Sequence, residues 1–192
     1  MDGQVVVNHD ATYNNVHIAS STYDEVRKLK LTNGETFPSL KEYLAEAIKQ
    51  NNTRLVLEIK ADSTSDDYCD RLVRAVMADI REIDAQEWIT IITFSKGVMM
   101  SALKYEPSMG VGYLNGDLSP AELKKLGCWI LNYNFKLFKE KPSLFEEARS
   151  AGVSVNVWTV NEREDMIYFM DHNVDRITTD KPDILIQLKK SK

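Results

Sequence analysis

From residue 55 onward, short apolar runs alternate with amphipathic segments. The apolar runs are rich in β-branched residues, which is typical of strands, and the segments between them carry apolar residues at helical spacing. Strands that alternate with helices of this length predict βαβ units and a parallel sheet. The predicted strands are 55–60, 89–94, 110–114, 129–133, 153–158 and 176–179.

Several helix ends carry local signals. In a capping box, a serine or threonine and a glutamate three residues later satisfy each other's backbone N–H groups. Glycine just past a periodic segment indicates the end of a helix. The predicted N-terminal pairs are Thr22 with Glu25, Ser39 with Glu42, Ser119 with Glu122 and Asn161 with Glu164, and the predicted terminal glycines are Gly127 and Gly152.

The first fifty residues have a weaker pattern. Residues 4–8 form a valine-rich run that predicts a strand, and residues 11–20 are polar and predict a loop. One domain is expected for 192 residues, with residues 10–50 as an insertion at the mouth of the sheet and residues 54–192 as the βα units.

The strand at 55–60 carries charge where a buried strand should be apolar. Side chains alternate between the two faces of a strand, so Val56, Glu58 and Lys60 share one face. A simple ion pair at an exposed strand end would explain the charges. The alternative is a polar site at the C-terminal mouth of a parallel sheet, where α/β proteins bind ligands.

Two architectures fit this pattern: an open doubly wound sheet and a closed (β/α)8 barrel. An open sheet usually carries a glycine-rich phosphate loop after an early strand, and none occurs here. A barrel predicts polar residues at the C-terminal ends of several strands, and this pattern recurs. The pairs are Glu58 and Lys60, Thr93 and Ser95, Asn132 and Asn134, Asn156 and Trp158, and Thr178 and Asp180. Six strands, however, are too few to close the barrel.

Composition narrows the function classes. The net charge is −5 and no lysine- or arginine-rich stripe occurs, which argues against a nucleic-acid partner. No apolar run is long enough to span a bilayer. Cys69 and Cys128 are too far apart for a metal motif, and we expect both to be buried. Of the other histidines, His17 is expected to be solvated, and His172 has no assigned chemistry.

Six ordered motifs extend over nearly the whole chain: Asp2-Gly3, Val5–Asp10, Phe37–Glu42, Leu57–Lys60, Trp158–Asn161 and Ile177–Pro182. In their order and spacing they resemble the glycerophosphodiester phosphodiesterases. The resemblance implies an incomplete TIM-barrel-type fold of the PLC-like phosphodiesterase kind, with six parallel βα units and an N-terminal hairpin strand. It also implies hydrolysis of glycerophosphodiesters to glycerol 3-phosphate and an alcohol, a reaction of lipid and glycerol metabolism.

The same resemblance assigns roles to individual residues. His9 matches a catalytic histidine, and Glu58 matches a metal-ligand carboxylate for Mg²⁺ or Ca²⁺. Lys60 corresponds to a lysine near the phosphate, and Phe94 and Trp158 correspond to aromatic residues around the substrate. Histidine suits acid–base work because its pKa lies near working pH.

The chain departs from the family at its start. Family members begin with a strand ending in His-Arg-Gly and a second ending in Glu-x-Asp, and neither motif occurs here. We therefore expect a truncated enzyme with little activity, in which Met1 is internal to a longer reading frame and residues 5–9 return from a missing strand. The rival interpretation is a non-catalytic remnant that binds phosphate or forms a homodimer through its exposed barrel edges.

Overall fold

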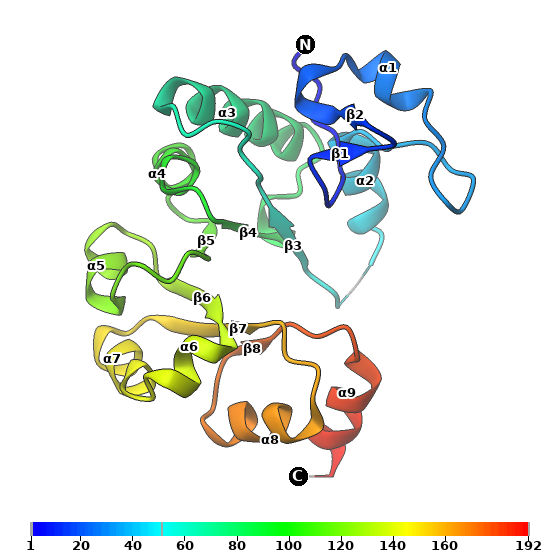
Figure 1. Ribbon diagram of the computed structural model, residues 1–192. Helices are drawn as coiled ribbons and strands as arrows, with labels where there is room; N and C mark the ends of the chain where they lie inside the picture. The colour runs from blue at the N-terminus through cyan, green and yellow to red at the C-terminus, as the bar shows by residue number, and fades with distance from the viewer. Residues whose placement is uncertain (1, 51, 192) are drawn as a thin grey trace.

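The computed structural model describes residues 2–50 and 52–191, and a parallel sheet in the order β3-β4-β5-β6-β7-β8 forms its centre (Figure 1). Each strand pairs in parallel with the next strand of the chain. The strands are β3 Leu55–Glu58, β4 Ile89–Thr93, β5 Gly110–Tyr113, β6 Ile130–Asn134, β7 Ser154–Trp158 and β8 Arg176–Ile177. The predicted strands are therefore confirmed, with small shifts at their ends.

Helices follow the strands and cover the outer face of the sheet (Figure 1). They are α3 Asp66–Glu82, α4 Lys96–Tyr105, α5 Pro120–Lys125, α6 Phe135–Glu140, α7 Ser143–Ala151, α8 Arg163–Asp171 and α9 Pro182–Lys190. The short helix α6 was not predicted, because six residues carry too little periodicity. Its start has a local cause, since the side chain of Asn134 accepts a hydrogen bond from the Lys136 N–H at 3.0 Å.

The predicted helix ends are confirmed except one. Thr22, Ser39 and Ser119 form complete capping boxes, and Gly127 and Gly152 have positive φ just beyond α5 and α7. The Asn161 cap is wrong, because the N-cap of α8 is Glu162. Asn161 instead accepts hydrogen bonds from the Thr179 hydroxyl and the Asp180 N–H and donates one to the Asp180 carboxylate.

Contacts between non-adjacent strands show that the sheet curves into a half-barrel. Arg176 on β8 donates from Nη1 to Thr90 Oγ1 on β4 at 3.2 Å. Trp158 on β7 lies edge-on to Phe94, which follows β4, with ring centroids 5.5 Å apart. In a flat sheet, strands four positions apart lie roughly 19 Å from each other. The fold is therefore an incomplete barrel of TIM type and not an open doubly wound sheet.

The two edges of the half-barrel are unpaired. Within the described residues, β3 pairs with β4 alone and β8 pairs with β7 alone. Val56, on the inner face of β3, is 47% exposed.

The N-terminal segment forms a pairing that the sequence did not predict. Residues 4–8 do not form a strand of the sheet: Val6 makes one antiparallel bridge to Ser39, and Leu40 N–H donates to Val5 O at 2.8 Å. Within the described residues, this segment pairs with the chain around Ser39, and its pairing with a preceding strand stays a prediction.

Residues 11–20, predicted as a loop, contain the hairpin of β1 Thr12–Tyr13 and β2 Val16–His17. Asn14 and Asn15 turn it with positive φ values of 48° and 65°. Asparagine tolerates this region, so Asn-Asn was the missed signal. The turn of 3₁₀ helix Ile18–Ser20 and the helices α1 Tyr23–Arg27 and α2 Leu40–Ala47 complete the region.

One hydrophobic core lies between the outer face of the sheet and the helices. It contains Ile91, Val111, Leu131 and Val157, one from each of the four central strands. Both cysteines are fully buried and unpaired, as predicted. Among the described helices, none is long and apolar enough to cross a membrane.

Ile91 tests the role of this core. Ile91 is fully buried, so we expect Ile91→Ala to lower the free energy of unfolding by about 2–5 kcal/mol. The matched control is Ile186→Ala on α9, where the side chain is 52% exposed and we expect a change below about 0.5 kcal/mol. Urea denaturation followed by circular dichroism measures both, and equal effects would contradict this assignment of the core.

Candidate active site at the barrel mouth

The inner face of β3 ends in an ion pair. Lys60 Nζ lies 3.0 Å from Glu58 Oε1, and the two side chains are 43% and 24% exposed. An ion pair this exposed stabilises a fold by about 1 kcal/mol or less. Stability alone is therefore a weak reason for two charges on an inner face.

An aromatic pair lies at the same mouth. Phe94, 47% exposed, is in edge-to-face contact with Trp158, and the indole Nε1–H of Trp158 donates to Asn132 O at 2.9 Å. The strand register brings these residues together with the ion pair, because Glu58 pairs with Ile92, two residues before Phe94. The mouth thus combines the Glu58–Lys60 ion pair with an apolar wall.

Two buried amides lie beneath this wall. Asn132 on β6 and Asn156 on β7 are direct neighbours in the register, and both are at least 96% buried, with exposed fractions of 3% and 4%. Neither side-chain oxygen has a hydrogen-bond partner among the described residues. Unpartnered buried acceptors reduce stability, and such groups concentrate at functional sites.

Some polar strand ends serve the fold rather than the mouth. Thr93 is fully buried and donates to Ile59 O at 2.8 Å, and Ser95 is the N-cap of α4. Asn134 caps α6. The five polar pairs in the sequence therefore predicted too many residues at the mouth, because side chains that cap helices produce the same pattern.

The hydrogen-bond partner of His9 is its neighbour Asp10, and not a member of the Glu58–Lys60 ion pair. Its side chain is 84% exposed, and its Nδ1 lies 2.8 Å from Asp10 Oδ1. No hydrogen bond or ion pair joins His9 to Glu58, both of which are described residues. The catalytic role of His9 stays a prediction, as do the roles of Glu58, Lys60, Phe94 and Trp158.

His17, which was expected to be solvated, contacts the chain at the end of β3. His17 Nε2 lies 3.2 Å from Asp62 Oδ1, just beyond β3, and its Nδ1 lies 2.8 Å from Ser20 Oγ. The His17 side chain is still 38% exposed, and the contact with Asp62 was missed because a contact between a hairpin and a distant loop has no sequence signature.

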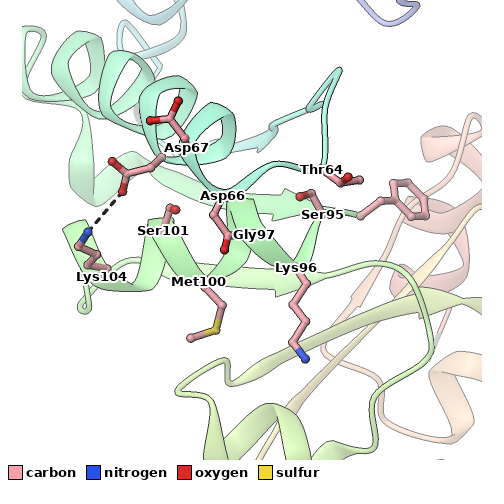
Figure 2. Close-up of a pocket in the computed structure, with 11 residues that line it drawn as sticks. Thr64, Asp66, Asp67, Ser95, Lys96, Gly97, Met100, Ser101 and Lys104 are labelled. Carbon is pink, nitrogen blue, oxygen red and sulfur yellow. Dashed lines mark hydrogen bonds and ion pairs between the residues drawn. The ribbon is translucent and has the colours of Figure 1, made fainter.

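A groove of about 880 Å³ opens beside the mouth, between α3 and α4 (Figure 2). Phe94 lines it and therefore borders both the groove and the mouth. Asp70, on the groove wall, accepts a hydrogen bond from the Tyr105 hydroxyl at 2.7 Å, and this bond lowers the pKa of the Asp70 carboxyl. Lys104 pairs with the same carboxylate at 3.4 Å.

The described residues do not by themselves form a metal site. A hard cation such as Mg²⁺ or Ca²⁺ takes about six oxygen ligands. Among residues 2–50 and 52–191, no group of three or more His, Cys, Asp or Glu side chains lies close enough to hold an ion. Glu58, the expected ligand, is paired with Lys60.

Known proteins share this fold and are similar in sequence. The neighbours in structure are TIM-barrel-type phosphodiesterases, so the curved sheet with its polar mouth belongs to a class of hydrolases. Residues 1–184 match the Glycerophosphoryl diester phosphodiesterase family. The chain therefore belongs to that family of phosphoric diester hydrolases, which confirms the resemblance.

Individual relatives are similar over most of their length. A glycerophosphodiester phosphodiesterase of Caldanaerobacter subterraneus subsp. tengcongensis is 28% identical over 203 residues, which cover 97% of this chain and 81% of that protein. The crystal structure of one from Parabacteroides distasonis is 34% identical with a TM-score of 0.94, covering 98% of this chain and 79% of that chain.

A more distant structure contains a ligand. The Oleispira antarctica phosphodiesterase is 20% identical to this chain with a TM-score of 0.82, and the match covers 96% of this chain and 80% of that chain. That protein is in complex with the product sn-glycerol-3-phosphate.

The buried amides generate a stability prediction. We expect Asn156→Leu to raise the free energy of unfolding by about 1 kcal/mol, because it removes an unpartnered buried oxygen. The control is Asn161→Leu, which removes three hydrogen bonds and should lower the free energy of unfolding by about 1–3 kcal/mol. Thermal and urea denaturation measure both changes. Destabilisation by Asn156→Leu as large as the control's would contradict the prediction.

Proposed function

We propose that this mouth serves the hydrolysis of glycerophosphodiesters to glycerol 3-phosphate and an alcohol, a step in lipid and glycerol metabolism. The observation that supports this most directly is the Glu58–Lys60 pair on the inner face of β3, in a chain of this family. Water supplies a hydroxyl group to phosphorus, the bond to the alcohol oxygen breaks, and that oxygen takes a proton.

Lys60 is the proposed phosphate ligand. Its ammonium group is a compact charge on a flexible stem, so it can leave Glu58 Oε1 and contact a phosphate oxygen. Glu58, at 24% exposed, keeps that lysine at the mouth when the substrate is absent.

Phe94 and Trp158 form the proposed wall for the carbon atoms of the substrate. The exposed face of Phe94 offers apolar area, and the hydrogen bond from Trp158 to the backbone of β6 fixes the orientation of the second ring. Packing against such a wall removes apolar surface from water and positions the phosphate near Lys60.

His9 is the proposed acid–base residue. Asp10 lies at Nδ1 and orients the ring, which leaves Nε2 to exchange a proton with the alcohol oxygen or with water. Because His9 is highly exposed and has no hydrogen bond or ion pair to the described mouth residues, its use depends on where the arm that carries it lies.

A divalent cation, Mg²⁺ or Ca²⁺, remains part of the proposal, with Glu58 as one ligand. The described residues supply too few oxygen ligands for such an ion, so no step above depends on it. For the same reason we propose that this chain alone has little or no hydrolytic activity.

The alternative is a non-catalytic remnant of the same fold that binds phosphate or self-associates. The unpaired edges of β3 and β8 and the exposed Val56 support it, because unpaired strands offer backbone groups to another chain. A homodimer that covers these edges would result. Sedimentation at micromolar concentration should then show a dimer, and a compact monomer would count against this alternative.

Lys60 generates a binding prediction. We expect glycerol 3-phosphate to bind at the mouth and Lys60→Met to weaken binding by about tenfold or more, because a hydrogen bond to a charged group is lost. The matched control is Lys124→Met on α5, whose Nζ lies 3.5 Å from Gly152 O. Isothermal titration calorimetry measures both. Equal affinities for the two variants would contradict the role of Lys60.

The activity is tested by following glycerophosphocholine by phosphorus NMR with Mg²⁺, with Ca²⁺ and with a chelator. For this chain we expect no metal-dependent turnover above that of Glu58→Gln. Turnover that the chelator abolishes and Glu58→Gln reduces would disprove the inactivity of the chain and support the enzyme proposal. Absence of both turnover and glycerol 3-phosphate binding would count against both functions.

A further inference from the structure

His17 joins the arm that carries His9 to the end of β3. Its Nε2 lies 3.2 Å from Asp62 Oδ1, and its Nδ1 lies 2.8 Å from Ser20 Oγ. A neutral imidazole donates from one nitrogen and accepts at the other. If the Ser20 hydroxyl donates to Nδ1, the hydrogen is on Nε2 and points at the Asp62 carboxylate, so both contacts hold one ring orientation.

The backbone connects this contact to His9. His17 is the register partner of Thr12, and Ile18 N–H donates to Ala11 O at 2.9 Å. Ala11 follows His9 by two residues, and two residues span at most about 7 Å. The position of His17 therefore restricts where His9 can lie.

The other side of the contact belongs to the strand that carries the ion pair. Asp62 follows Lys60 by two residues and Glu58 by four. On one side, the His17–Asp62 contact is linked to His9 through Thr12, the hairpin partner of His17, which follows His9 by three residues. On the other side, Asp62 follows Lys60, the predicted phosphate ligand, by two residues.

We propose that His17 is a positioning residue that, through Asp62, holds the arm of residues 8–20 at the barrel mouth and so brings His9 to the substrate. This inference rests on the proposed role of His9. The side chains of His17 and Asp62 are 38% and 42% exposed. Pairs this exposed shift an equilibrium by about fivefold at most, so the contact favours the observed position of the arm without locking it.

The first test measures hydrogen exchange in the arm and needs no substrate. In Asp62→Ala and in His17→Leu, we expect the amide of Ile18 to exchange with deuterium about two- to fivefold faster than in the unaltered chain. The double variant should match the single ones, because both remove the same contact. Asp62→Glu, which keeps a carboxylate, should retain the slow exchange. The control is His172→Gln, whose ring contacts Tyr168 O on α8 and which should leave Ile18 unchanged.

The second test reads His9. The three histidine rings give separate carbon–proton NMR signals, and in the unaltered chain saturating glycerol 3-phosphate should shift the His9 signal. Asp62→Ala should reduce this shift while the Trp158 indole signal still responds to the ligand, and Asp62→Glu should restore it. A general loss of structure would instead alter both signals.

The outcomes separate the two proposals. If glycerol 3-phosphate shifts the NMR signal of neither His9 nor Trp158 in the unaltered chain, the proposed function fails. The exchange rate of the Ile18 amide then still decides whether His17 holds the arm. Unchanged Ile18 exchange and an unchanged His9 response in Asp62→Ala would overturn the positioning role.

Discussion

The two-residue alternation of side chains along parallel strands in a curved sheet is the constraint on which this structure depends. It sends Ile91, Val111, Leu131 and Val157 outward, where helices bury them, and it sends alternate residues of the same strands inward. A one-residue change in register would exchange these two sets. Core and mouth are therefore set by one pattern, and substitutions on the two faces should have separable effects.

Curvature turns this inner face into a site. Phe94 and Trp158 come from strands three positions apart, and Arg176 and Thr90 from strands four apart, yet each pair is in contact. Residues far apart in the sequence thereby surround one space. The Glu58–Lys60 pair and the unpartnered oxygens of Asn132 and Asn156 lie on this inner face, where they add little to stability. A protein that retains such groups is more readily explained by binding than by folding.

The sequence predicted the strands, most helix ends and the family because these depend on local periodicity and on ordered motifs. The sequence missed features that depend on tertiary contacts. Thr93 and Ser95 looked like mouth residues but support backbone and helix ends, and His17 looked solvated but contacts Asp62. The pairing of residues near Val6 with residues near Ser39 was also missed. In each case the sequence identified the residue type but not the residue that it contacts.

The most direct test of the account is the set of contacts between isotope-labelled protein and glycerol 3-phosphate, measured by intermolecular nuclear Overhauser effects. The account predicts cross-peaks from the glycerol protons to the rings of Phe94 and Trp158, together with a shift of the Lys60 ammonium signal. Cross-peaks to the outer helices, with the Lys60, Phe94 and Trp158 signals unchanged, would contradict it.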